Sequence, residues 1–458
     1  MSRLYTRLRA CAALLLVGAA LPAQAATLLV TTSADELNTD GDCSLREAVQ
    51  AANTNVGVDA CGNGSTGGDT ILFTAITGQT VTLTAGQIEV TDGLTIGDAV
   101  STVTIVASVG ARHFRLSLTS PVEPVQLTNV TLRGGSGIIG GSVLVADGQP
   151  STFRTVTFDQ NTSAASGGAL RVGAGTHTLA GCVFTANTTS VAGVTDGGGA
   201  VYNNGGTLDV RSSSFSNNTA IAGTANGGAV LNGFGGTLNV SIGTTFTSNQ
   251  AARAGGAIES AGNLTVDGGS FTGNMAGING GAVHLTGAVT AAFTGSTGFV
   301  NNAAGMEGGA VWNSATGTLT MANPQITGNS AAGPAADQGG GGVFSDGGTT
   351  TLTNPNIDGN RATGAAGSGG GVLNTAGGRL TVTGGSITSN TAVRAGGGVE
   401  TNLSGGATGN TLALNNVTIS LNNAGTAPGF GGGVHVTGAA VATVTGGTVS
   451  GNTAVEGG

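Results

Sequence analysis

The sequence contains no lysine and very few aromatic residues. All 14 basic residues among the 458 are arginine, which excludes Schiff-base or lysine-base chemistry. Aromatic residues make up 3% and charged residues 8%, too few for ordinary surface helices to be common. Beyond residue 25, no stretch offers the ~20 consecutive apolar residues of a membrane-spanning helix. The composition therefore predicts neither a helical protein nor a transmembrane helix.

Positive charge is scarce as well. Beyond residue 25 the chain keeps 11 arginines against 23 acidic residues, a formal charge of −12. This excess of negative charge argues against nucleic acid and anionic lipid as partners, because both carry negative charge themselves.

Residues 1–25 have the pattern of a secretory signal peptide. A basic start (Arg3, Arg7 and Arg9) precedes a short apolar core and the small-x-small cleavage site Ala23-Gln24-Ala25. We expect an exported chain that begins near Ala26. In a secreted protein, Cys43 and Cys61 predict a disulfide that closes a short loop, and Cys182 is expected to be a small core residue.

Glycine supplies 87 residues, and a repeat decides where they stand. Between Phe158 and Asn452 an apolar residue is followed three positions later by asparagine eleven times, at steps of 25 to 32 residues. The asparagines are Asn161, Asn187, Asn218, Asn249, Asn274, Asn302, Asn329, Asn360, Asn390, Asn422 and Asn452. The apolar partners are Phe158, Phe184, Phe215, Phe246, Phe271, Phe299, Ile326, Ile357, Ile387, Ile419 and Val449. After ten of the asparagines comes a tetrad of Gly-Gly, then Ala or Gly, then an aliphatic residue, from 167–170 to 431–434.

This period predicts an all-β fold, a right-handed parallel β-helix. In the unit 198–219, alternation places Val201, Leu208 and Val210 in the core and Ala200, Tyr202 and Asp209 outside. Such short segments bury their apolar face only when coils stack at ~4.8 Å, and the crossover rule makes the winding right-handed.

The asparagines are interpreted as a structural turn ladder. Asparagine tolerates a left-handed backbone, and stacked amides hydrogen-bond along a column, so we expect each one to turn a corner and bond its neighbours. The Phe and Ile set is expected to form an internal apolar stack.

Both repeat motifs resemble those of the chlamydial polymorphic outer membrane proteins, over roughly residues 150–458. From Val343 onward the tetrad alanine becomes glycine and the phenylalanine becomes Ile or Val, which departs from that pattern. The resemblance implies a cell-surface autotransporter passenger associated with adhesion. The chain stops at Gly457-Gly458, which has the form of half a tetrad, so we expect a sequence truncated at its C-terminus.

The N-terminal part, residues 26–100, predicts a cap with the first strands, ahead of the repeats at 101–458. Thr27–Thr32 alternates like a strand, and a capping box of Ser44 and Glu47 opens a helix. Leu45, Ala48, Val49 and Ala52 share one face, which we expect to cover the open apolar end of the stack. The run Cys43-Ser44-Leu45-Arg46-Glu47-Ala48 resembles the domain of bacterial secreted proteins named CSLREA, over roughly residues 27–100.

Catalytic and metal-binding patterns are weak, so we expect no catalytic residue, no metal and no cofactor. The acidic residues near tetrads, Asp196, Glu307 and Asp337, are too scattered for a glycosidase pair or a calcium site. His113, His177, His284 and His435 lack zinc-ligand spacing and are expected at the surface. A polysaccharide-active enzyme of the pectate lyase kind remains the alternative function.

One column of positions varies in chemistry from coil to coil. The residues directly after the tetrads are Arg171, Tyr202, Leu231, Glu259, His284, Trp312, Phe344, Leu373, Glu400 and His435. If each tetrad ends inward, these side chains point outward on one face. Two interpretations stay open: they pack under the neighbouring loops, or Tyr202 to Leu373 form an exposed ligand strip.

The sequence therefore predicts a non-enzymatic, adhesin-like protein at the cell surface or outer membrane. The expected partner is a surface protein or glycan of a host or neighbouring cell. Contact with a membrane is expected only through a C-terminal segment that this chain does not contain.

Overall fold

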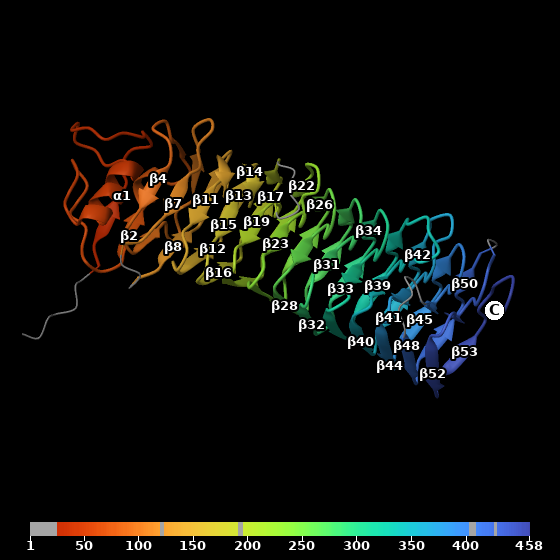
Figure 1. Cartoon of the computed structure of the whole chain (residues 1–458). Helices are drawn as coiled ribbons and strands as arrows, with labels where there is room; N and C mark the ends of the chain where they lie inside the picture. Colours follow the sequence, from red (N-terminus) through yellow and green to blue (C-terminus); the bar gives the residue numbers. More distant parts are fainter. Residues whose placement is uncertain (1–24, 120–122, 191–195, 403–408, 426–427) are drawn as a thin grey trace, which may run out of the picture.

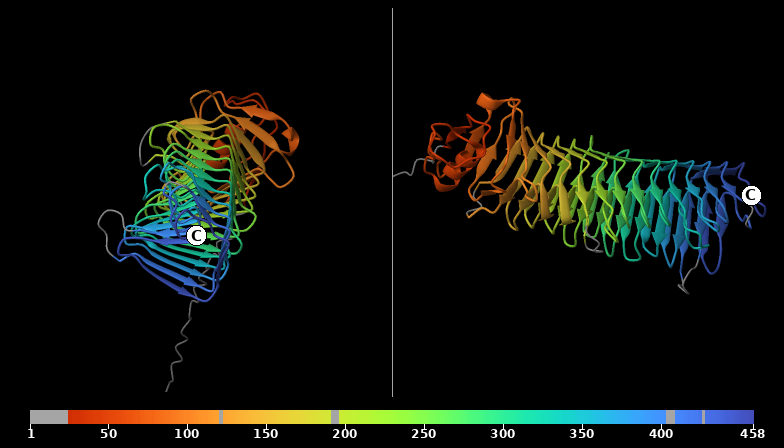
Figure 2. Two further views of the ribbon diagram at one scale, coloured as in Figure 1. Left: turned by 90° about the vertical axis from the view of Figure 1, so that its right-hand side faces the viewer. Right: turned by 90° about the horizontal axis from the view of Figure 1, so that it is seen from above.

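The computed structural model describes residues 25–119, 123–190, 196–402, 409–425 and 428–458. The expected signal peptide lies outside these residues apart from Ala25. The chain winds into a long rod of stacked coils (Figures 1 and 2). Four sheets of 15, 14, 13 and 11 strands run along the rod, and every strand pair in them is parallel. The predicted parallel β-helix is confirmed.

We name the sheets A to D, and each coil from β11 (Val143–Val145) to β50 (Asn423–Ala424) contributes one strand to each of them. One coil consists of β19 (Val201–Asn203) in sheet C, β20 (Thr207–Arg211) in A, β21 (Ser214–Ser216) in B and β22 (Thr219–Ala220) in D. Sheet A ends at β52 (Val441–Thr445), sheet B at β53 (Thr448–Ser450) and sheet D at β50 (Asn423–Ala424).

Sheet C carries the variable column and is followed here in full. Its strands are β4 (Ile88–Val90), β7 (Phe114–Leu116), β11 (Val143–Val145), β15 (Leu170–Val172), β19, β23 (Val230–Asn232), β27 (Ile258–Ser260), β31 (Val283–Leu285), β35 (Val311–Asn313), β39 (Val343–Asp346), β43 (Val372–Thr375), β47 (Val399–Thr401) and β51 (Val434–Val436).

The core is a continuous apolar interior along the rod. Val201, Leu208 and Val210 are fully buried as expected, while Tyr202 and Asp209 are half-buried. The placement of Ala200 outside was wrong, because this alanine is fully buried. Its strand begins only at Val201, so the alternation of an extended chain does not apply to the corner before it.

Phenylalanine rings form the predicted internal stack. From Phe158 to Phe299, successive ring centroids lie 4.6 to 5.0 Å apart and the planes are tilted by at most 9°. The isoleucines from Ile326 to Ile419 continue the stack in the interior. Val449, in the last coil, is 59% exposed.

The asparagine ladder is confirmed, but its backbone differs from the expectation. The amide of Asn187 donates to Oδ1 of Asn218 at 2.9 Å and to the carbonyl oxygen of Phe158 at 3.0 Å, so it joins three coils. The left-handed residue is the one before each ladder asparagine, such as Ala186 at φ 52° and Leu421 at φ 57°. The ladder asparagine itself turns its amide inward, and the preceding residue therefore turns the corner.

The two glycines of each tetrad have different roles. The first glycine takes a left-handed backbone, with Gly198 at φ 65°. A Cβ on the second, Gly199, would lie 2.1 Å from the carbonyl oxygen of Gly228 in the next coil. The tetrad therefore allows both a sharp corner and a close approach of neighbouring backbones.

The predicted N-terminal helix is α1 (Leu45–Thr54), which packs against β1 (Thr27–Leu29), β2 (Asp69–Leu72) and β4. Ser44 and Glu47 form the capping box, and the predicted apolar face from Leu45 to Ala52 is buried. Figure 1 shows α1 at the N-terminal end of the rod. The disulfide between Cys43 and Cys61 is present, and Cys182 is buried.

Three histidines contradict the expected surface position. His113 and His177 are fully buried, and His284 is 5% exposed. His113 Nε2 donates to the carbonyl oxygen of Ile105 at 2.9 Å, and its Nδ1 accepts from the hydroxyl of Ser142 at 2.9 Å. These partners make burial of the neutral ring tolerable, and burial lowers the pKa of His113 to about 4.

Candidate functional site

The variable column lies in register along sheet C. Backbone pairing places each member directly opposite the next, from Arg171 to His435. The register extends the column to Leu144, Arg115 and Glu89. Sequence analysis missed Glu89 and Arg115 because no Gly-Gly pair precedes their strands, and Leu144 because its tetrad, residues 140–143, has serine in place of Ala or Gly. We call the whole set, from Glu89 to His435, the C-sheet column.

Exposure divides the C-sheet column into two classes. Tyr202 and Trp312 are half-buried, and Arg115 is exposed. The expectation of an exposed strip from Tyr202 to Leu373 is wrong for five of its members, which are at most 5% exposed: Leu231, Glu259, His284, Phe344 and Leu373. Glu400, in the column beyond that strip, is fully buried.

The tetrad corner lies close against the C-sheet column. A Cβ on the first glycine of a tetrad would nearly touch the Cβ of the column residue four positions later: 2.6 Å for Gly396 and Glu400, and 2.8 Å for Gly369 and Leu373. The chain thus folds back against the column before it enters sheet C. Alternation gives the direction of a side chain, but the corner alone does not decide its exposure: Trp312 is half-buried, although a Cβ on Gly308 would lie 3.0 Å from its Cβ.

The middle of the column contains a buried acid and histidine pair. His284 Nδ1 donates to Glu259 Oε2 at 2.7 Å, and the Thr286 hydroxyl donates to Glu259 Oε1 at 2.5 Å. The His284 ring stacks on Trp312, with centroids 4.3 Å apart. Trp312 Nε1 donates to Glu307 Oε2 at 3.0 Å. Most polar groups at the centre of the column are therefore engaged within the protein.

Acidic side chains gather beside Trp312. Burial raises the pKa of Glu307, and the nearby charges of Asp346 and Asp337 raise it further. Burial and Asp337 also raise the pKa of Asp346. Glu307 and Asp337, which the sequence analysis took as too scattered to form a pair, therefore lie close enough to influence each other. Asp346 was missed because it follows the tetrad by three residues.

A second buried acid lies near the C-terminal end of the column. Glu400 is fully buried and pairs with Arg394, and His435 Nδ1 lies 3.4 Å from Glu400 Oε1. Arg394 Nε also donates to the hydroxyl of Ser368 at 2.8 Å. The Arg394–Glu400 ion pair therefore holds this part of the column together.

A pocket of about 240 Å³ opens on the column between Tyr202 and Thr286. Besides these two residues it is lined by Leu231, Phe234, Arg253 and Glu259, and we call it the Tyr202 pocket. Phe234 is 92% exposed. Sequence analysis missed Phe234, Arg253 and Thr286 because they lie beside the repeat motifs, although an aromatic residue between Gly233 and Gly235 is an unusual turn residue.

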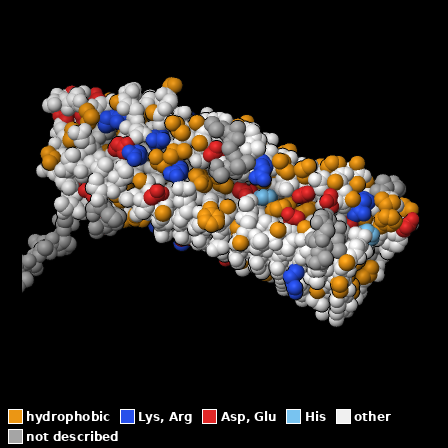
Figure 3. Space-filling view, viewed as in Figure 1, with side chains coloured by type: hydrophobic (Ala, Val, Ile, Leu, Met, Phe, Trp, Pro, Cys, Tyr) orange, Lys and Arg blue, Asp and Glu red, His pale blue; other side chains and the backbone are white. Residues whose placement is uncertain are grey.

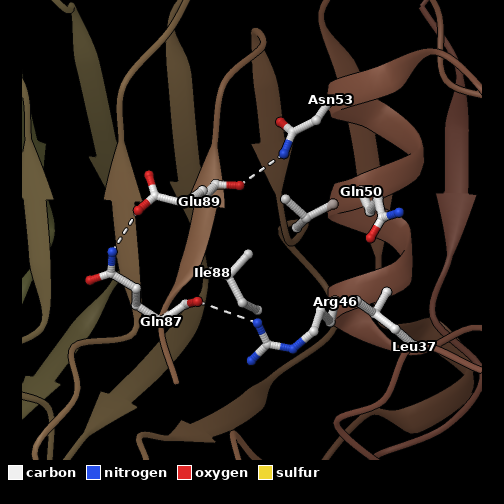
Figure 4. Close-up of a pocket in the computed structure, with 8 residues that line it drawn as sticks. Leu37, Arg46, Gln50, Asn53, Gln87, Ile88 and Glu89 are labelled. Atoms are coloured by element: carbon white, nitrogen blue, oxygen red, sulfur yellow. Dashed lines mark hydrogen bonds between the residues drawn. The ribbon is translucent and has the colours of Figure 1, made fainter. Parts of the chain in front are cut away.

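Another pocket, of about 260 Å³, lies between α1 and β4 (Figure 4). Arg46 donates to the carbonyl oxygen of Gln87 at 3.3 Å, and the Asn53 amide donates to that of Glu89 at 2.8 Å. Figure 4 shows these bonds crossing from the helix to the strand. They attach the cap to the first strand of sheet C, which supports a structural role for this pocket.

Three carboxylates of the cap come close to one another, contrary to the expectation that acidic residues are scattered. Oxygens of Glu36, Asp40 and Asp42 lie within 4.8 Å of one another, the one such group of potential metal ligands in the part of the chain that the structure describes. The Asn38 amide donates to both Glu36 and Asp40. The group has a partner within the chain, and its chemistry alone does not define a metal site.

The outer face of sheet A is chemically more uniform than the C-sheet column. Outward positions of sheet A are mostly threonine, including Thr207, Thr237, Thr318, Thr349 and Thr351. Figure 3 shows charged and hydrophobic side chains gathered in a band along the rod, whereas much of the remaining surface is white. On the face that Figure 3 shows, side-chain diversity is therefore concentrated in this band.

Two stretches of the chain match the model of the Chlamydia polymorphic membrane protein repeat, at residues 155–172 and 243–261. Each stretch spans one Phe-x-x-Asn motif and the tetrad after it. These two stretches are similar to this repeat. The likeness agrees with the resemblance seen in the sequence and places it on the corner and core positions of sheets B and C. No curated protein and no solved structure matches the chain.

The only α-helix in the described part of the chain, α1, has 10 residues. No helix among the described residues has the length and apolar character needed to cross a membrane.

Proposed function

We propose that this protein is an exported, surface-displayed binding protein of the adhesin type, and that it contacts its partner along the C-sheet column. The similarity of its coils to the Chlamydia polymorphic membrane protein repeat supports a place at the cell surface or outer membrane. The Cys43–Cys61 disulfide supports an oxidising compartment, in keeping with a signal peptide at 1–25 and with the resemblance to secreted CSLREA-domain proteins.

This proposal rests on the difference in side-chain chemistry between the outer faces of sheets A and C. Stacking requires apolar residues inside and small polar residues outside, and threonine on sheet A meets that need at every coil. The C-sheet column instead changes from charged to aromatic to aliphatic, and Tyr202, Phe234 and Trp312 are accessible along it. Exposed aromatic side chains together with arginine are the residues enriched where proteins bind partners.

The test is binding of the fluorescently labelled chain, from Ala26 onward, to cultured epithelial cells and to bacterial cells. The double variant Tyr202→Ser with Phe234→Ser should bind at least tenfold less. Its matched control replaces Ile242 and Met275 by serine, two exposed apolar residues away from the column. Absence of wild-type binding to every surface, or equal binding by both double variants, contradicts the proposal.

One observation favours polysaccharide cleavage as a second candidate. Glu307 has a raised pKa and lies beside Trp312 with two further carboxylates near it, and a raised pKa is what a general acid in glycoside hydrolysis needs. Release of reducing ends from polysaccharides by the wild type, with loss of that release in Glu307→Gln, would establish it. The same assay without any product removes this candidate.

A further inference from the structure

We propose that the Tyr202 pocket binds a carboxylate-bearing sugar ring at the end or in the chain of an acidic glycan. This inference rests on the proposed function and names the ligand class of its site. It depends on four properties of the pocket: its size, its fixed aromatic wall, its unneutralised arginine and the pairing of the strands beneath it.

Size limits the ligand to one ring. The pocket, at about 240 Å³, is smaller than the roughly 300 Å³ at which sites for drug-sized ligands begin. It is open toward solvent beside the exposed Phe234. A single ring fits inside, and the rest of a polymer would continue over the surface.

The Tyr202 ring is held in place before any ligand arrives. Its hydroxyl donates to Asn204 Oδ1 at 2.9 Å, and the Arg171 guanidinium lies 5.7 Å from the ring centroid. A Cβ on Gly233 would lie 3.0 Å from Cε2 of the ring, so glycine leaves just enough room for it. A preformed aromatic wall suits the apolar face of a pyranose ring, because little side-chain entropy is lost on binding.

Arg253 supplies a positive charge without an acidic partner. Its Nη1 lies 3.4 Å from Asn226 Oδ1, and no carboxylate among the described residues lies within 4.0 Å of its guanidinium. The acid that lines the pocket, Glu259, is already bonded to His284 and Thr286. In a chain with excess negative charge, a free guanidinium at a pocket favours a carboxylate ligand, which it can bind in a bidentate manner.

The pairing of the strands argues against a peptide in this pocket. The strands beneath it, β19, β23 and β27, are each hydrogen-bonded to a neighbour on both sides. A peptide therefore cannot add as a strand, the mode in which backbone bonds supply affinity. Recognition here depends on rings and isolated polar groups, which match a sugar ring with one apolar face and a charged substituent.

Isothermal titration calorimetry with matched sugars tests the proposal. We expect 3′-sialyllactose to bind at least tenfold more tightly than lactose, or cellobiouronic acid more tightly than cellobiose. The first result identifies a sialylated glycan as the source of the carboxylate, and the second a uronic acid polymer. Arg253→Met, which keeps the apolar stem, should reduce binding of the acidic sugar about tenfold and leave the neutral sugar unchanged.

Two control variants separate the ring and charge contributions. Phe234→Ser should weaken acidic and neutral sugars alike, whereas Arg361→Met, at an exposed arginine in β42 (Arg361–Ala362) of sheet D, should change nothing. Circular dichroism and melting confirm that each variant folds, which is expected because the altered side chains are solvent-accessible.

Equal affinity for acidic and neutral sugars, equal binding by Arg253→Met, or binding of neither sugar pair overturns the inference. If the labelled chain still binds cells through the column in that case, the proposed function stands and only its ligand class is wrong. If cell binding is absent too, both fail.

Discussion

Asn187 donates two hydrogen bonds to a single atom of Asn218. Its backbone N–H and its side-chain amide both reach Oδ1 of Asn218, at 3.0 and 2.9 Å. Asn218 in turn donates to the carbonyl oxygen of Phe184 at 3.0 Å and is fully buried. The amide therefore satisfies polar groups of neighbouring coils in the buried interior, and the ladder repeats this arrangement along the stack.

Replacement of Asn218 by alanine should lower the free energy of unfolding by about 3 kcal/mol, because it leaves buried donors and an acceptor unpaired. The midpoint of urea unfolding measures the change. Asn239→Ala, which removes one bond to Asp209 on the outer face, is the control and should cost under about 1 kcal/mol. Equal effects of the two substitutions would contradict a structural ladder.

Leu421→Gly should stabilise the protein by about 1 kcal/mol. Leu421 is 66% exposed and has φ 57°, a backbone region that costs a residue with a Cβ roughly 1–2 kcal/mol. The loss of backbone entropy offsets part of this gain. Leu421→Ala keeps the strained backbone and should leave the melting temperature unchanged. A lower melting temperature for the glycine variant would show that the leucine side chain has a contact role.

Gly199→Ala should destabilise the coils by about 3 kcal/mol, because the new methyl group would meet the carbonyl oxygen of Gly228 at 2.1 Å. Gly298→Ala is the matched control. A Cβ there has no neighbour within 4 Å and no positive φ is required, so its melting temperature should stay close to that of the wild type. If both variants have the same melting temperature, close stacking of neighbouring coils is not the reason for glycine at this position of the tetrad.

Acid should destabilise the fold through His113. Its folded pKa of about 4 lies below the ordinary value of 6.5, so in that interval the unfolded chain binds the proton more readily. Stability from this group is complete above pH 6.5 and falls as the pH drops toward 4, by about 3 kcal/mol at most. Urea unfolding between pH 7 and 4 should show a smaller decline for His113→Gln. Parallel curves for variant and wild type would refute this assignment.

The chain's periodicity was sufficient to predict the parallel coils, the Phe stack and the asparagine column. These features repeat at each coil, and a strand of three to five residues has two faces that alternation separates. The capping box of Ser44 and Glu47 was also predictable, because it depends only on two residues three positions apart in the sequence. The backbone conformation of the ladder was harder to predict from the sequence. Gln160 and Asn161 both follow the same strand, and spacing does not show which of them takes the left-handed conformation at the corner.

For the C-sheet column, the sequence predicted which residues belong to it but not which of them are exposed. Its membership followed from the tetrads, because the residue after an inward position must point outward. Whether that residue is exposed to solvent depends on contacts beyond its own strand. At Glu400 the glycine corner packs against the side chain, and the loop residue Arg394 pairs with its carboxylate. The Tyr202 pocket likewise combines Tyr202, Phe234 and Arg253 from three successive coils. Sequence spacing sets direction within a coil, whereas exposure and charge pairing depend on how neighbouring coils pack against one another.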